Sequence, residues 1–167
     1  GDCWEDYEVG ERINHPNAMT VNDSDHSTAT RLYQNTAKVH FDAVQMRSTP
    51  AGKRLVYGGH VISLCRSLAY DGLENTFTVL AVNGGTHVAP TYAGDTLCCA
   101  TQVLERIDLG HPLMGALRPR MLGAKDLERS AAIEFRAPTG PEAKYHSAIV
   151  LDLDYTVAIP KRPPSSH

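Results

Sequence analysis

Apolar residues recur at helical spacing over residues 58–70, where they occupy positions i, i+1, i+3, i+4, i+7 and i+8. A stripe this wide predicts a helix that is buried over most of its surface. Gly58 and Gly59 at its start permit close approach of the backbone to a neighbour. A second helix is predicted over residues 22–35, because the small polar residues that open this segment cap the free amides of a first turn.

The chain after residue 72 alternates between apolar runs and turn residues. Strands are predicted over residues 77–82, 96–107, 115–124 and 148–159, and turns at Asn83-Gly84-Gly85 and Ala93-Gly94-Asp95. A buried helix followed by a run of antiparallel strands predicts a single α+β domain. We assign residues 1–160 to this domain and expect residues 161–167, which are rich in proline and serine, to form a flexible tail.

Composition excludes several classes of protein. The 167 residues are 42% apolar, which suits one core of ordinary size, and the formal charge of -3 gives no basis for nucleic-acid binding. The apolar runs are too short to span a membrane. The four cysteines form no C-x-x-C pair and no zinc-like spacing with histidine. We therefore expect a cytoplasmic protein with reduced thiols and with no metal, membrane or nucleic-acid partner.

Two of the eight histidines are candidates for chemistry. His40 follows a predicted helix and precedes irregular chain, from where an imidazole reaches a cleft and exchanges protons near neutral pH. The alternative is a surface histidine bonded to Asp42. His60 adjoins the glycine pair at a helix start, where unpaired amides bind a developing oxyanion, although the glycines alone also suit tight packing. His87, on a predicted strand, is expected to be structural.

Three motifs occur in an order that resembles the MaoC-like family of hot dog-fold enoyl-CoA hydratases. They are residues 35–42 (NTAKVHFD), 57–64 (YGGHVISL) and 89–95 (APTYAGD). The family shows G-D-x-N-P-x-H-x-D, then H-G before a helix with S-L, then P-x-x-x-G-D. Residues 31–41, 55–64 and 150–155 resemble more closely the C-terminal half of mesaconyl-CoA (2-methylfumaryl-CoA) hydratases. Those enzymes usually fuse two hot dog repeats in one chain, and one repeat is present here.

The resemblance implies a hot dog fold, in which a curved antiparallel sheet wraps around a central helix. Related single-domain proteins pair two sheets edge to edge, and acyl-CoA lies in the groove between the subunits. A lone hot dog domain also leaves a long sheet edge to be covered. We therefore expect a homodimer or a higher even oligomer.

The resemblance also implies roles for individual residues. His40 matches the family's catalytic histidine and Gly58 its oxyanion glycine. Asn35 stands at the position of the catalytic aspartate, and an amide orients water but does not take its proton. His40 would therefore carry more of the acid–base work, or Asp42 would assist. Tyr57 replaces the histidine that usually precedes the oxyanion glycine.

The implied reaction is reversible addition of water to an enoyl-CoA thioester, with no metal or redox cofactor and with CoA as part of the substrate. A branched C5 dicarboxylyl-CoA of the mesaconyl or itaconyl type is the preferred substrate. Its free carboxylate needs a cationic partner, for which Arg66 and His60 are candidates. Tyr57, Gly59 and Asp42 complete the expected substrate-binding set.

Two other functions remain open. The first is an acyl-CoA thioesterase, which often relies on a carboxylate on or near the central helix. The absence of any acidic residue between residues 58 and 70 weighs against it. The second is a non-catalytic acyl-CoA-binding subunit, because Asn35 lacks the carboxylate of the active enzymes.

Overall fold

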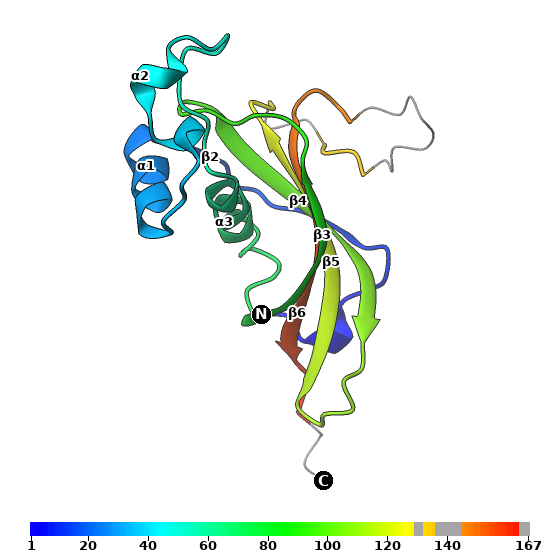
Figure 1. Ribbon diagram of the computed structural model, residues 1–167. Helices are drawn as coiled ribbons and strands as arrows, with labels where there is room; N and C mark the ends of the chain where they lie inside the picture. The colour runs from blue at the N-terminus through cyan, green and yellow to red at the C-terminus, as the bar shows by residue number, and fades with distance from the viewer. Residues whose placement is uncertain (129–131, 136–144, 164–167) are drawn as a thin grey trace.

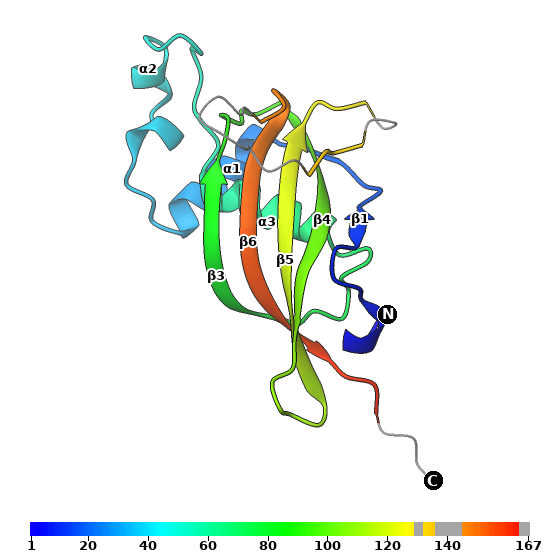
Figure 2. The same ribbon diagram turned by 90° about the vertical axis from the view of Figure 1, so that its right-hand side faces the viewer.

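The computed structural model describes residues 1–128, 132–135 and 145–163. Within them one antiparallel sheet contains six strands in the order β1-β4-β5-β6-β3, and β2 pairs with β4 beside β1. Figure 2 shows the four long strands side by side, with β3 at one edge. The strands are β1 (Arg12–Asn14), β2 (Met19–Thr20), β3 (Thr78–His87), β4 (Thr96–Ile107), β5 (Met114–Lys125) and β6 (Ile149–Pro160).

The helices lie on one face of this sheet (Figure 1). They are α1 (Asp23–Leu32), α2 (Ala43–Met46) and α3 (Gly58–Leu68), with two short 3-10 turns, η1 (Trp4–Asp6) and η2 (Lys38–His40). The two helices predicted from the sequence are confirmed, and α3 begins at the glycine pair as expected. No helix in the described ranges is long and apolar enough to cross a membrane.

The main core lies between α3 and the sheet. Cys65 of α3 and alternate residues of β6, among them Leu151, are buried in it. Gly123 of β5 lies directly beneath the helix, because a Cβ atom built on it would lie 2.7 Å from the Cys65 sulfur and 3.2 Å from Leu151 Cβ. Glycine is therefore needed for helix and sheet to approach this closely. Burial raises the pKa of Cys65 to about 12, as expected for a core thiol.

The opposite face of the sheet carries charged side chains that link β5 to β6. Arg118 donates two hydrogen bonds to Asp154, at 2.9 and 2.7 Å, and Arg120 does the same to Asp152. The hydrogen bond from Arg118 holds the pKa of Asp154 below its usual value. These paired charges stay on the outer face, because successive residues of a strand point to opposite faces.

Strand β3 is an edge strand on which all ten residues are exposed. The predicted turn at Asn83-Gly84-Gly85 was wrong, because these residues lie inside β3 and pair with β6. Register shifts between Val79 and Ala81 and between Val82 and Gly84 accommodate them, and glycine in a strand often accompanies such bulges. The Asn83 side chain donates to both Asp154 and Thr156 of β6, at 3.0 Å each.

The residues that follow β6 contact the β4–β5 connection and the N-terminal segment. The Lys161 ammonium is 2.6 Å from Asp108, and the backbone N–H of Arg162 donates to the Glu5 carboxylate at 2.9 Å. The remainder of the predicted tail, residues 164–167, lies outside the described residues.

Candidate active site

A pocket of about 500 Å³ opens where the start of α3 meets the end of β3. Three segments that are distant in the sequence contribute to it: the loop around η2, the turn into α3, and the chain after β3. The lining residues are Asn35, His40, Leu55, Val56, Tyr57, Gly58, Gly59, Val61, His87, Val88, Ala89, Pro90 and Thr91. All three motifs that carry the family resemblance therefore reach one cavity.

His40 is held in one tautomer by the backbone. Its Nδ1 atom lies 3.0 Å from the carbonyl oxygen of Leu55. A carbonyl only accepts hydrogen bonds, so Nδ1 carries the proton and Nε2 keeps a free lone pair. Leu55 is itself tied to this loop, because its N–H donates to the Val39 carbonyl at 3.0 Å. His40 is thus prepared to accept a proton at Nε2, and its partner is Leu55 rather than Asp42.

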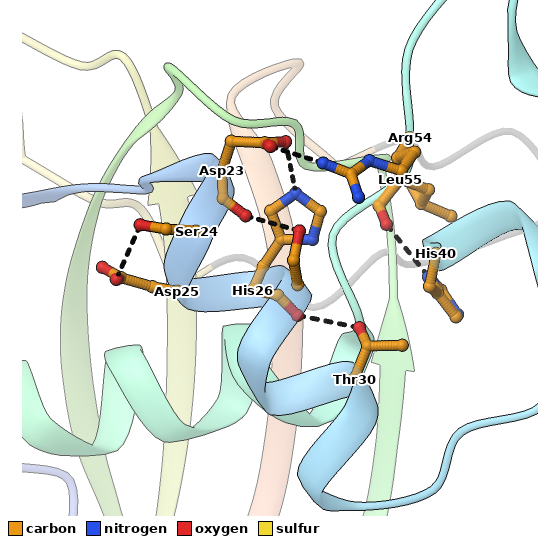
Figure 3. Close-up of polar contacts among 9 residues, drawn as sticks. Asp23, Ser24, Asp25, His26, Thr30, His40, Arg54 and Leu55 are labelled. Carbon is orange, nitrogen blue, oxygen red and sulfur yellow. Dashed lines mark hydrogen bonds and ion pairs between the residues drawn. The ribbon is translucent and has the colours of Figure 1, made fainter. Parts of the chain in front are cut away.

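The segment that holds His40 is braced by α1 (Figure 3). Asp23 in the first turn of α1 pairs with Arg54, the residue before Leu55. The same carboxylate lies 3.2 Å from Nε2 of His26, whose side chain is fully buried. The hydrogen bond from Arg54 lowers the pKa of Asp23, and burial lowers the pKa of His26. The Asp23–Arg54 pair therefore links α1 to the segment that carries the Leu55 carbonyl.

Asn35 presents a hydrogen-bond donor to the pocket rather than a base. Its Oδ1 atom accepts from the N–H of Ala37 at 2.9 Å, which identifies this atom as the oxygen of the amide. The remaining group is the amide NH2 at Nδ2. An amide NH2 donates hydrogen bonds and takes up no proton, so Asn35 can orient a water molecule but cannot act as its base.

The first turn of α3 supplies two unpaired amides. The N–H groups of Gly58 and Gly59 precede the first intrahelical bonds, and both residues line the pocket. A Cβ atom on Gly58 would lie 2.5 Å from His87 Nε2, and one on Gly59 would lie 2.6 Å from the Tyr57 ring. Two rings therefore pack directly over this turn, and side chains at positions 58 and 59 would displace them.

Tyr57 lies between the catalytic histidine candidate and the helix start. Its ring packs edge-on against His40, with 5.8 Å between the ring centroids. With its ring over Gly59 as well, Tyr57 forms one wall of the pocket. The structure thus brings together Asn35, His40, Tyr57 and the glycine pair.

The other predicted site residues lie elsewhere. Asp42 accepts a hydrogen bond from the N–H of Gln45 at 2.9 Å and caps α2. Arg66 is eight residues after Gly58, or about 12 Å along the helix, where its guanidinium donates to Thr76. His60 is in α3, and its Nε2 atom is buried without a hydrogen-bond partner in the described residues. None of these three residues lines the pocket.

His87 was not recognised as a site residue from the sequence. It ends β3, where its backbone pairs with Leu151 of β6, and it lines the pocket. Its side chain makes no hydrogen bond within the described part of the chain. His87 is exposed as a residue, but neighbouring atoms partly exclude water from its imidazole, and this desolvation lowers the pKa of the ring. Nothing in the local sequence indicates this placement, because the contact with Gly58 joins residues that only the fold brings together.

The sequence is similar to two curated bacterial enzymes, whereas no family model matches it. It is 44% identical over 160 residues, or 95% of its length, to the beta-methylmalyl-CoA dehydratase of Chloroflexus aurantiacus. It is also 44% identical over 158 residues to the mesaconyl-CoA hydratase of Cereibacter sphaeroides. The chain spans 44% of the length of each of these relatives.

Solved structures show the same fold. A MaoC domain protein from Chloroflexus aurantiacus superimposes with a TM-score of 0.87 at 43% identity, over 96% of this chain and 45% of the other. A Mycobacterium tuberculosis protein with a double hot dog fold superimposes with a TM-score of 0.68 at 25% identity, over 96% of this chain and 41% of the other.

A sheet packed around a central helix, with a pocket at the first turn of that helix, defines a hot dog domain, and the expected fold class is confirmed. The likeness in sequence and structure identifies the group more closely. Over this one domain the chain is similar in sequence and in structure to MaoC-like hot dog proteins, the group that the three motifs predicted.

Proposed function

We propose that the protein adds water reversibly to the α,β double bond of an enoyl-CoA thioester. The observation that carries this proposal is the fixed tautomer of His40, which leaves a basic Nε2 atom in the pocket that the glycine amides of α3 share. Relatives of this chain are named as a dehydratase and a hydratase of CoA thioesters.

In the proposed reaction Asn35 Nδ2 holds the water, and His40 Nε2 removes its proton as the water oxygen bonds to the β-carbon. Electrons of the double bond move toward the thioester oxygen, where the Gly58 amide stabilises the negative charge. The imidazolium of His40 then gives a proton to the α-carbon. Water is added without a net change in oxidation state, so the reaction needs no redox cofactor. Because His40 and the Gly58 amide are proposed to carry the proton transfer and the oxyanion, a chelator should leave the rate unchanged.

The substrate we propose is a branched C5 dicarboxylyl-CoA of the mesaconyl type. The names of the two curated relatives support this class. A thioesterase is less well supported, because no aspartate or glutamate is among the described residues that line the pocket. Hydrolysis at this site would therefore lack the carboxylate on which hot dog thioesterases often rely.

One assay separates the three candidate functions. Mesaconyl-CoA is incubated with the protein, and loss of the conjugated absorbance is followed beside release of free thiol. Hydration removes the absorbance without releasing thiol, hydrolysis releases thiol, and a binding subunit does neither. The proposal predicts the first result, with the His40→Asn variant as the control. Thiol release, or no reaction, would contradict it.

We further propose that a second hot dog domain covers the edge of β3, as in a homodimer or a higher even oligomer. Strand β3 and the residue before it expose several apolar side chains, and the edge has unpaired backbone groups. These side chains are Phe77, Val79, Leu80 and Val82. A second domain that paired with β3 would cover both features.

Light scattering tests the assembly. We expect a dimer or larger even oligomer at micromolar concentration, and a monomer for Val82→Lys, which places a charge on the edge. Val44→Lys is the matched control, because Val44 is equally exposed but lies on α2. A monomeric wild-type protein, or dissociation by both variants alike, would contradict an interface on β3.

We also propose a cytoplasmic location. All four cysteines are free thiols, which suits a reducing compartment. Fractionation of the source cells, with detection of the protein by antibody, tests this. Recovery from an extracellular or periplasmic fraction would contradict it.

A further inference from the structure

The active-site pocket contains very few basic groups. No lysine or arginine is among the described residues that line it, and its only basic side chains are His40 and His87. Arg66, one of the two candidates for binding the substrate carboxylate, donates a hydrogen bond to Thr76 farther along α3. Among the described residues of the pocket, two histidines are therefore the side chains that can carry a positive charge opposite an anionic substrate group.

His87 occupies a defined place within the pocket. Its Nε2 atom would lie 2.5 Å from a Cβ atom on Gly58, so the imidazole sits directly over the first turn of α3. No hydrogen bond from any described residue satisfies its ring nitrogens. An unpartnered imidazole that faces a pocket is free to donate to a ligand.

The chemistry of the substrate places its carboxylate near this ring. In a mesaconyl-type thioester the free carboxylate is attached to the β-carbon and is three bonds from the thioester carbon. If the thioester oxygen lies on the Gly58 amide, the carboxylate must lie within a short distance of the same helix turn. In the proposed reaction His40 contacts the water that attacks the β-carbon. His87 is therefore the histidine of the pocket that remains for the carboxylate.

We propose that His87 binds the free carboxylate of the dicarboxylyl-CoA and sets the preference for dicarboxylic over monocarboxylic enoyl thioesters. This inference rests on the proposed function and assigns its substrate specificity to one residue. The bond is formed between an imidazole N–H and a carboxylate oxygen, a contact between charged groups once the imidazole is protonated.

The surroundings of His87 favour proton uptake when an anion binds. Its partner on β6 is Leu151, and the helix turn beside it consists of Gly58 and Gly59. The other titratable groups that line the pocket are His40 and Tyr57. Asp152 of β6 is turned to the opposite face and is bound by Arg120. Since burial lowers the pKa of His87, a bound carboxylate raises it and draws a proton from solution.

Kinetic discrimination is the first test. The kcat/KM values for mesaconyl-CoA and for 2-methylcrotonyl-CoA, in which a methyl group replaces the carboxylate, are compared as a ratio. We expect His87→Ala to lower this ratio about 10- to 100-fold, the usual effect of losing one hydrogen bond to a charged group. His87→Gln, which keeps a neutral donor near the position of Nε2, should lower it less. His111→Ala, on an exposed loop, should leave the ratio within about twofold.

Binding of saturated analogues is the second test and does not depend on turnover. Calorimetry at pH 7 in two buffers of different ionisation enthalpy compares methylsuccinyl-CoA with 2-methylbutyryl-CoA. We expect proton uptake with the first analogue only, and we expect His87→Gln to abolish it. An unchanged affinity ratio in the His87 variants would overturn the inference, even if the protein hydrates mesaconyl-CoA. If the protein had no hydratase activity but the affinity ratio of the two analogues still depended on His87, the proposed function would be overturned and the inference supported.

Discussion

Replacement of His40 by asparagine separates the proposed chemistry of this residue from its structural contact. Asparagine places an amide nitrogen near the position of the imidazole Nδ1, so the bond to the Leu55 carbonyl, 3.0 Å in the wild type, is retained. The Nε2 lone pair is lost, together with the part of the ring that packs against Tyr57. We expect kcat to fall by a factor of about 10² to 10⁴, the usual contribution of a positioned acid or base.

The expected loss of stability is far too small to account for such a fall. Loss of one neutral hydrogen bond, as in His40→Ala, costs about 0.5–1.5 kcal/mol. A protein with an ordinary free energy of unfolding, about 5–15 kcal/mol, then remains more than about 99% folded. A decrease in turnover by about two orders of magnitude or more, in either variant, must therefore come from the chemistry.

The assay follows hydration of mesaconyl-CoA under saturating substrate, beside thermal unfolding of each variant. We expect His40→Ala and His40→Asn to lose activity to a similar extent, with His40→Asn closer to wild type in unfolding midpoint. If the turnover of His40→Asn stayed within tenfold of wild type, the basic nitrogen of residue 40 would not be the proton acceptor, and the reasoning from its tautomer would fail.

Three further predictions concern the helix start, the core and the buried histidines. Gly58→Pro removes the amide proposed to bind the thioester oxygen, so turnover should fall at least about 10²–10³-fold; wild-type turnover would place the oxyanion site elsewhere. Gly123→Ala should lower stability by about 1–3 kcal/mol, because its methyl group meets a sulfur at 2.7 Å. The control Gly84→Ala, with nothing within 4 Å, should unfold like wild type, and equal midpoints for the two variants would contradict the close packing. Burial lowers the pKa of His15 and of His26, so below about pH 6.5 the unfolded chain binds more protons than the folded one. The unfolding midpoint should therefore fall between pH 7 and pH 5 and stay level above pH 7, and a midpoint that rises on acidification would refute this.

Elements with a strong and continuous apolar pattern could be predicted from the sequence alone. The wide stripe of α3 and the alternation along β6 were sufficient, because each pattern fits one kind of element with one buried face. The segment at residues 83–85 was misread because Asn-Gly-Gly is a local signal for a turn. In the fold, pairing with β6 and two register shifts outweigh that signal.

The candidate site was predictable where a motif supplied it and not where it depends on distant packing. His40, Asn35 and Gly58 come from motifs and converge on one pocket. Arg66 was a candidate because it is a cation on the predicted helix, and the sequence does not show that its side chain bonds Thr76 outside the pocket. His87 reaches Gly58 only because the sheet brings the end of β3 over the first turn of α3.

Strand β3 carries both the exposed sheet edge and one of the residues that line the pocket. Its outer edge is unpaired and apolar, and its last residue, His87, forms a wall of the pocket. An edge strand held on one side only is less restrained than a strand paired on both sides. A second domain that pairs with β3 would therefore also limit the motion of the His87 backbone relative to Gly58. Because a carboxylate is recognised by a short and directional bond, the proposed specificity depends on that restraint. Assembly and substrate preference are thus expected to share a physical cause in this strand, although no residue of the exposed edge before His87 lines the pocket.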